Sequence, residues 1–192
     1  MRIALSLPPI GHDFSLLKEV ALKAEDRGFE GLWLGEAWGT EAATMASAFL
    51  SCTQRIRVGT GIMSMYLRPP TLAAMQAATM DLVGPGRARL GIGVSTRNIN
   101  RFHGINWDHP IERTREYVEV VKRVLDDERV TRTGGFYRPQ GFRLSLKLDQ
   151  PMPIYLAAVN PLMLQLAGEI ADGVLLAWLP AREIQNSLAE IS

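Results

Sequence analysis

The sequence predicts an α/β fold built around a parallel sheet, and three observations support this prediction. Short apolar runs alternate with longer amphipathic stretches along the whole chain, which is typical of βα units. Glycine and proline stand at the borders of these segments, where they end one element or begin the next. Six such units recur at roughly 25–40 residues, a spacing that suits right-handed crossovers between parallel strands.

The first three units are predicted as strand–helix pairs. A helix over Ser15–Arg27 repeats its apolar residues on one face, and Gly28 stands where a C-cap glycine belongs. Pro69 and Pro70 open the third helix, since proline in a first turn loses no intrahelical hydrogen bond. The predicted strands are Arg2–Leu7, Gly31–Gly35 and Arg55–Met63, and the other two helices span Glu41–Ser51 and residues 70–82.

The last three units are interrupted by two longer connections. The stretch Ser95–Pro110 is long for a βα loop, which indicates a functional segment. The stretch Val130–Leu146 is predicted to be an inserted hairpin around Gly134-Gly135. The remaining strands are Arg87–Val94, Pro153–Ala158 and Gly173–Leu179, and their helices are Ile111–Leu125, Pro161–Ala171 and Ala181–Ile191.

The composition of the chain excludes several classes of protein and kinds of site. The chain has 192 residues, 47% hydrophobic and 21% charged, with a formal net charge of +1. We therefore expect one soluble domain over residues 1–192 and no affinity for nucleic acid or a membrane. The single cysteine excludes an intrachain disulfide, and the three histidines lack the spacing of metal ligands. No apolar run suits a signal peptide or a membrane span, so we expect a cytoplasmic protein.

Five segments resemble the luciferase-like family, and specifically its F420-dependent branch, which includes methylenetetrahydromethanopterin reductase. They are GFEGLWLGEA at 28–37, RIRVGTGIMSMYLRPPTLAAMQAATMDL at 55–82, GRARLGIGVS at 86–95, HPIERTREYVEVV at 109–121 and PIYLAAVNPLMLQLAGEIADGVLLAWL at 153–179. Six βα units alone fit an open sheet or a closed barrel. The resemblance implies a TIM-type (β/α)8 barrel of the bacterial-luciferase type and a homodimer. It also implies a chain truncated after about six units, without the last two.

The resemblance places a cofactor at the carboxyl ends of the strands, where barrel enzymes hold their ligands. It implies a cis peptide bond between Gly61 and Ile62 whose bulge supports the deazaflavin ring, although the glycines could simply relieve crowding. Further cofactor contacts are expected from Ser64 and from the turns after the fourth and fifth strands. Those turns are Gly93-Val94-Ser95, near the cofactor, and Ala158-Val159-Asn160, toward its phosphate.

Glu36 is the candidate catalytic residue, because it ends the second strand where relatives carry an acidic residue or an Asp-His pair. It could hydrogen-bond the cofactor or relay a proton, or it could be an acid that favours a helix N-terminus. Arg97 could meet an anionic tail or remain solvated. The expected substrate pocket is lined by Trp38, His103, Trp107 and Trp178.

Three functions remain open from the sequence. The first is an F420-dependent oxidoreductase that transfers a hydride between the deazaflavin and a small organic substrate. The second is an FMN-dependent monooxygenase on the same fold. The third is a non-catalytic flavin-binding remnant. Phosphate sites in barrels often use the loops after the seventh and eighth strands, which a chain truncated after six units would lack.

Overall fold

The computed structural model describes residues 3–8, 13–176 and 179–191. A strand is present at each of the six predicted places. The strands are β1 (Ala4–Leu7), β2 (Gly31–Leu34), β3 (Arg57–Thr60), β4 (Met63–Ser64), β5 (Ala88–Gly93), β6 (Ile154–Ala157) and β7 (Gly173–Leu175). The helices are α1 (Phe14–Asp26), α2 (Ala42–Cys52), η1 (Met65–Leu67), α3 (Pro70–Val83), α4 (Arg97–Phe102), α5 (Pro110–Leu125), α6 (Pro161–Ile170), η2 (Ala181–Glu183) and α7 (Ile184–Glu190).

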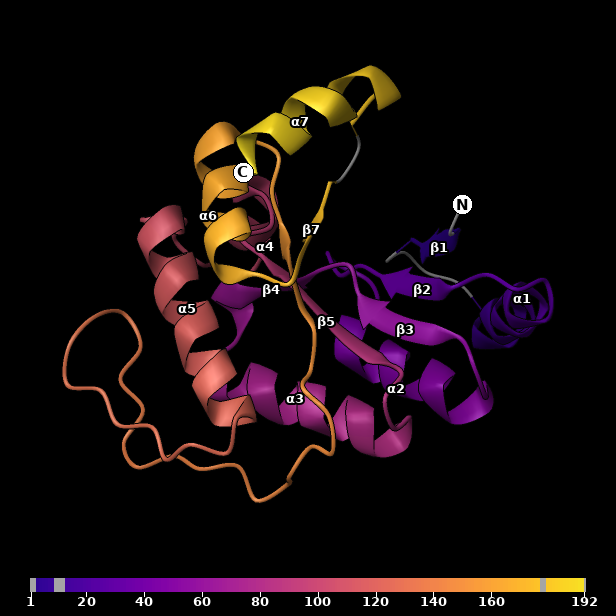
Figure 1. The fold of residues 1–192 in the computed structure, drawn as a ribbon, viewed down its shortest axis with the longest axis horizontal. Helices are drawn as coiled ribbons and strands as arrows, with labels where there is room; N and C mark the ends of the chain where they lie inside the picture. Colours follow the sequence, from indigo (N-terminus) through magenta and orange to yellow (C-terminus); the bar gives the residue numbers. More distant parts are fainter. Residues whose placement is uncertain (1–2, 9–12, 177–178, 192) are drawn as a thin grey trace.

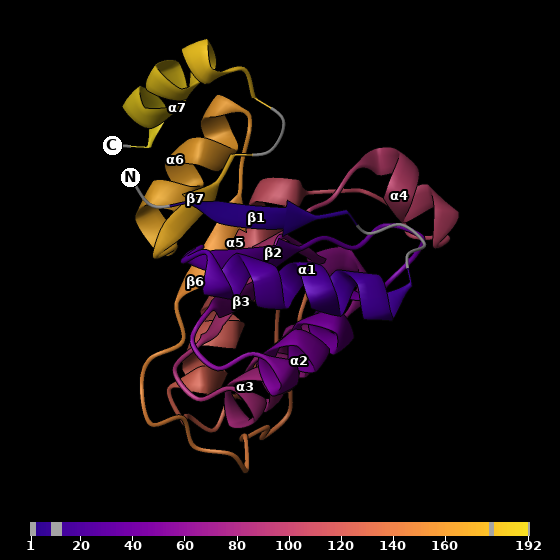
Figure 2. The same cartoon turned by 90° about the vertical axis from the view of Figure 1, so that its right-hand side faces the viewer.

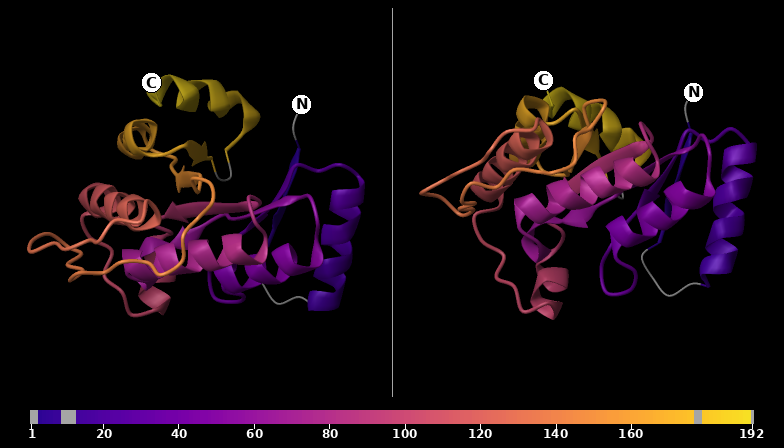
Figure 3. Two further views of the ribbon diagram at one scale, coloured as in Figure 1. Left: turned by 60° about the horizontal axis from the view of Figure 1, so that its bottom comes forward. Right: turned by 90° about the horizontal axis from the view of Figure 1, so that it is seen from below.

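All neighbouring strands of the sheet are parallel. Their order is β1-β2-β3-β5-β6-β7, and β4 pairs with β5 beside this path. The sheet curls, and α1, α2, α3, α5 and α6 lie along its outer side (Figures 1 and 3). The barrel architecture predicted for these units is therefore confirmed as a curled half-barrel, with β1 and β7 at its two edges.

Successive side chains of a strand point to opposite faces of the sheet, so one set packs against the outer helices and the other faces the inside of the curl. We call the packing between sheet and helices the outer core. Leu32 and Leu34 on β2 are buried in the outer core, whereas Trp33 between them is half-buried and meets Tyr155 of β6 edge to face at 5.0 Å. The helices contribute small side chains such as Ala46 and large ones such as Phe49, both fully buried. Within the described residues, no helix is long and apolar enough to cross a membrane.

Two glycines allow the strands to approach closely inside the curl. A Cβ atom on Gly59 would lie 2.6 Å from Cζ3 of Trp33, so this glycine relieves crowding, as one interpretation of the sequence proposed. A Cβ atom on Gly91 would lie 1.9 Å from the carbonyl oxygen of Thr60. The Thr60 hydroxyl donates to the Gly91 carbonyl at 2.7 Å and accepts from its N–H at 2.9 Å. This pair of hydrogen bonds joins the end of β3 to β5, just before β4 replaces β3 as the partner of β5.

Gly91→Ala is expected to lower the free energy of unfolding by about 1–3 kcal/mol or more, because backbone atoms rather than a flexible side chain must move. Gly134→Ala is the matched control, because a Cβ atom there would meet nothing within 4 Å. Urea denaturation of both variants measures the difference. Equal stability of the two variants would contradict the close packing of β3 on β5.

Three predicted elements differ in the structure. The predicted strand Arg55–Met63 is divided into β3 and β4 at Gly61 and Ile62. The stretch Val130–Leu146 is not a regular hairpin: where it is described, its arms meet in one antiparallel bridge between Val130 and Phe142. Its tip instead bonds to a helix side chain, since the Glu116 carboxylate accepts two backbone N–H groups of the tip at 2.9 and 2.7 Å. The predicted irregular loop after β5 contains the short helix α4.

Candidate functional site

The carboxyl ends of β4, β5 and β6 meet at one end of the half-barrel. The strand register pairs Ser64 with Gly93, and β6 follows as the next neighbour of β5. A Cβ atom on Gly93 would lie 2.9 Å from Cβ of Ala157 and 3.2 Å from Cδ1 of Ile62. The missing side chain at position 93 therefore lets the end of β5 pack against the end of β6 and against Ile62, which lies between β3 and β4. We call the surface formed by Gly61, Ile62 and Gly93 the ledge.

The peptide bond between Gly61 and Ile62 is cis, as the resemblance implied. The N–H of Gly61 donates to the Leu34 carbonyl at 2.7 Å, so the ledge is also tied to the end of β2. A Cβ atom on Gly61 would lie only 3.1 Å from Cβ of Trp33. Ser64 is fully buried, and within the described residues its hydroxyl oxygen has no hydrogen-bond partner.

Glu36 follows the end of β2 by two residues and takes part in a buried ion pair. Its two carboxylate oxygens accept from the guanidinium of Arg68 at 2.6 and 2.8 Å, and the side chains are 6% and 7% exposed. The same carboxylate accepts the N–H of Ser64 at 2.7 Å and that of Ala42 at 3.3 Å. Burial acts to lower the pKa of Arg68, but the hydrogen bonds and charge of Glu36 outweigh it and raise that pKa.

These contacts favour one of the two roles considered for Glu36. Ala42 is the first residue of α2, so the carboxylate does support a helix N-terminus. Both oxygens already accept from a cation and from backbone N–H groups, which is the environment of a positioning group rather than of a group that exchanges protons. A proton-relay role for Glu36 stays a prediction that these contacts do not favour.

The turn after β5 holds a residue in the left-handed region. Ser95 has a φ of 58°, and Thr96 caps α4 by accepting the N–H of Ile99 at 3.2 Å. The fully buried Asn100 donates from its side-chain amide to the Val94 carbonyl at 2.9 Å. The residues predicted to contact a cofactor here, Val94 and Ser95, are therefore held in place by α4.

The turn after β6 leads directly into α6. Ala158 is buried, whereas Val159 is 55% exposed. The side-chain oxygen of Asn160 accepts the N–H of Met163 at 3.0 Å, so this residue is the N-cap of the helix. The α6 N-terminus thus stands beside the carboxyl end of β6, with Val159 exposed next to it.

The short helix α4 lies on the side toward which the β1 arrow points in Figure 2, and an aromatic pair forms at this helix. Trp38 is 62% exposed and meets Phe102 edge to face at 5.9 Å. The Nε2 atom of His103 lies 3.0 Å from the carbonyl oxygen of Ala37. The structure therefore brings Trp38 and His103 together, as a shared pocket requires.

Trp107 occupies a separate place in the same loop. Its ring packs beneath the guanidinium of Arg97 at 4.6 Å from the ring centroid, so Arg97 makes a cation–π contact. Trp178, the fourth residue expected at the substrate pocket, lies outside the described residues. Among the described side chains, no group of three or more His, Cys, Asp or Glu residues could hold a metal ion.

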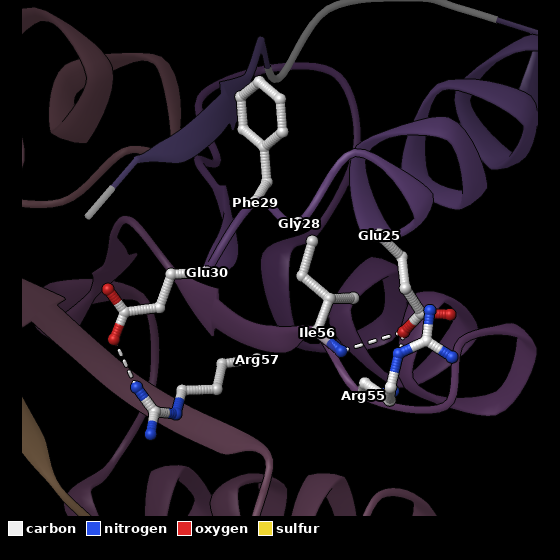
Figure 4. A pocket seen from close by; sticks show the side chains of 7 residues that line it. All are labelled: Glu25, Gly28, Phe29, Glu30, Arg55, Ile56 and Arg57. Atoms are coloured by element: carbon white, nitrogen blue, oxygen red, sulfur yellow. Dashed lines mark hydrogen bonds and ion pairs between the residues drawn. The ribbon is translucent and has the colours of Figure 1, made fainter. Parts of the chain in front are cut away.

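A pocket of about 390 Å³ lies at the opposite end of the strands (Figure 4). Glu25 lines it and accepts the backbone N–H groups of residues 54, 55 and 56 at 2.6–2.9 Å. Glu30, also in its wall, is paired with Arg57. The ionic groups here hold the amino ends of β2 and β3 together. Because barrel chemistry takes place at the carboxyl ends of strands, this pocket is not our candidate site.

Glu25→Gln is expected to lower the free energy of unfolding by about 1.5 kcal/mol at pH 7, the lower range for hydrogen bonds to a charged group. Burial acts to raise the pKa of Glu25, but the N–H donors of residues 54–56 and the charge of Arg55 outweigh it and lower that pKa. Its stabilising effect is therefore present above the unfolded pKa of about 4.3 and is lost as the pH falls through the folded pKa.

Thermal unfolding of both proteins between pH 7 and pH 3 measures this effect. The difference between wild type and Glu25→Gln should shrink as the pH falls below about 4. Asp26→Asn is the control, because Asp26 is exposed and lies 3.9 Å from Arg55, and exposed pairs contribute about 0–1 kcal/mol. A difference that grows in acid would contradict the assignment.

Sequence reasoning did not identify two residues that organise the site. Arg68 entered the sequence analysis only as part of the segment 55–82, and nothing there linked it to Glu36, 32 positions earlier. Asn100 lies in a stretch that was expected to be irregular, and no feature of the sequence indicated that its side chain would be buried.

A model of the luciferase-like monooxygenase family matches residues 3–192. An oxidoreductase of Mycobacterium tuberculosis, whose name assigns coenzyme F420 as its cofactor, is 37% identical over 187 residues, covering 90% of this chain and 51% of that protein. A 4-hydroxyprotoasukamycin monooxygenase of Streptomyces nodosus subsp. asukaensis is 32% identical over 191 residues, covering 92% of this chain and 52% of that protein.

The fold has a counterpart among solved structures. The coenzyme F420-dependent tetrahydromethanopterin reductase of Methanopyrus kandleri matches with a TM-score of 0.90 and 25% identity, covering 99% of this chain and 59% of that chain. This chain spans about half the length of the curated relatives named above. Since the family model covers nearly every residue, the chain belongs to the luciferase-like monooxygenase family.

Proposed function

We propose that this protein is an F420-dependent oxidoreductase that acts on a small organic substrate. The observation that carries the proposal is the ledge, where backbone and one aliphatic side chain form the surface between three strand ends. Two of the matched proteins, one by sequence and one by structure, are F420-dependent by name. When bound, a deazaflavin would supply or accept a hydride at its C5 carbon.

The residues at this end of the half-barrel fit such a cofactor. A planar tricycle needs a flat apolar support, which Ile62 and the side-chain-free Gly93 would provide. The buried hydroxyl of Ser64, without a partner among the described residues, would satisfy a polar atom nearby. The α6 N-terminus beside Val159 would attract the phosphate, because unpaired N–H groups and the helix dipole favour negative charge there.

The other named residues would shape the space above the ring. Trp38 and His103, held together by α4, would form one wall of the substrate pocket and exclude water from the reacting atoms. Trp107 would add its ring to the pocket wall, held in place by the guanidinium of Arg97 that packs over it. In this arrangement the chain orients the ring and the substrate, and Glu36 supports the site through the backbone N–H of Ser64.

An FMN-dependent monooxygenase is the second candidate, favoured by the family description and by the monooxygenase relative. Titration of the protein with F420 and with FMN, followed by fluorescence, separates the two candidates. We expect tight binding of F420 and weak binding of FMN. Tight FMN binding without affinity for F420 would overturn the proposal. Cofactor binding without turnover on any tested substrate would instead support the non-catalytic remnant.

We also propose a homodimer formed through the outer helices. Leu72, Met75 and Leu82 of α3 are 40%, 44% and 65% exposed, although they are large and apolar. Exposed apolar patches of this kind often mark interfaces. Leu82→Glu is expected to shift the protein toward monomer in light scattering after size exclusion, whereas Leu188→Glu on α7, 52% exposed in wild type, should not. Unchanged mass in both variants would exclude this interface.

A further inference from the structure

Ser64 is held on both sides by one buried ion pair. Its N–H donates to Oε1 of Glu36 at 2.7 Å, and its carbonyl oxygen accepts from Nη1 of Arg68 at 3.0 Å. The two charged side chains bond to each other at 2.6 and 2.8 Å. The backbone of Ser64 therefore cannot shift without disturbing a bidentate salt bridge that is almost fully buried.

The position of Ser64 determines what this clamp controls. Ser64 follows Ile62 by two residues and pairs with Gly93 in the register between β4 and β5. Ile62 and Gly93 lie against each other in the ledge, since a Cβ atom on Gly93 would lie 3.2 Å from Cδ1 of Ile62. A displacement of the Ser64 backbone would therefore be passed to both of them, because a tightly packed strand end moves as a unit.

A purely stabilising role explains this pair less well. Replacing a buried ion pair with apolar residues of similar volume is often neutral or stabilising, because two charges must lose their water. Arg68 instead makes contacts that fix a geometry: its planar fork engages both oxygens of Glu36, one carbonyl of the ledge strand and Glu41 at 3.3 Å.

We propose that Arg68 is a positioning residue that, through Glu36 and the backbone of Ser64, sets the height and tilt of the ledge. The inference deepens the proposed function and rests on it for the identity of the ring that the ledge supports. Arg68 itself is 8% exposed, so we expect it to touch neither ring nor substrate.

Arg68→Lys tests the inference, because lysine keeps the charge but has no planar fork. Amide hydrogen exchange at Ser64 is expected to rise at least tenfold, and the affinity for F420 to fall about 10- to 100-fold, since small misplacements of a binding surface have effects of this size. Arg115→Lys is the matched control, because Arg115 forms an exposed pair with Glu169. It should change both readouts less than twofold.

A double variant, Glu36→Met with Arg68→Met, keeps the test decisive if Arg68→Lys folds poorly. It leaves no buried charge unpaired, so it should be more stable than Glu36→Ala. The N–H and carbonyl groups of Ser64 lose their charged partners, so it should still fall below wild type in stability and lose the affinity. Wild-type affinity in this variant, or wild-type Ser64 exchange in Arg68→Lys, would overturn the inference. If the unsubstituted protein binds FMN instead of F420, the proposed cofactor is wrong, and the loss of affinity in the variants is measured with FMN. If it binds neither, the proposed function fails, and Ser64 exchange alone decides whether Arg68 holds the ledge.

Discussion

Glu36→Ala is expected to lower the free energy of unfolding by about 3–5 kcal/mol, because it leaves the buried guanidinium of Arg68 without its bidentate partner. Arginine cannot relieve the penalty by losing its proton. Glu41 lies near enough to interact with Arg68, at 3.3 Å, but its side chain is 38% exposed and it already caps α2. It would therefore compensate only in part.

Urea denaturation at pH 7 measures the effect. Glu36→Gln should be destabilised less than Glu36→Ala, since an amide oxygen can still accept one hydrogen bond from Arg68. The Met double variant described above should be more stable than Glu36→Ala, because both charges are removed together. A loss below about 1 kcal/mol for Glu36→Ala would show that solvent reaches Arg68 and that the pair is not buried.

Turnover and F420 affinity of Glu36→Gln, measured beside its stability, distinguish a proton relay from a buried partner of Arg68. A proton-relay residue would lose turnover with little change in stability when replaced by glutamine. A buried partner of Arg68 would lose stability and cofactor affinity together. The four contacts on the Glu36 carboxylate predict the second outcome.

Local patterns were sufficient to predict the strands and most helices of this chain. Alternating apolar runs and capping residues such as Gly28 act within a few residues of one another, so they can be read directly from the sequence. The pattern did not distinguish an open sheet from a barrel, because curvature depends on how strands pack. Gly59 and Gly91 allow that packing, but their role is evident only once Trp33 and Thr60 are seen against them.

The parts that sequence reasoning missed depend on contacts between distant residues. Arg68 and Glu36 are 32 positions apart, and no periodicity links them. The tip of the predicted hairpin bonds to Glu116, 20 and 21 positions earlier in the chain, so a helix side chain replaces the expected strand ladder. The cis bond at Gly61 was expected only because of the family resemblance, and no local rule would have indicated it.

Val159→Asp is expected to weaken F420 binding by about 10- to 100-fold, whereas Val159→Lys should preserve or strengthen it. Two like charges within about 6 Å repel by about 1.4–2.8 kcal/mol at an effective dielectric constant of about 20–40, which corresponds to this range. Val159 is 55% exposed beside the α6 N-terminus, so neither substitution should disturb folding. Fluorescence titration at low salt measures the affinities.

The charge dependence makes this prediction specific. Leu188→Asp introduces the same charge at an exposed position on α7 and should leave the affinity unchanged. The ratio between the Lys and Asp variants should shrink as salt is added, because an exposed charge is screened over about 8–10 Å. Equal affinities of the two Val159 variants would mean that the phosphate does not lie at α6. The ledge would then have to bind the cofactor in another orientation, or bind a ligand without a phosphate.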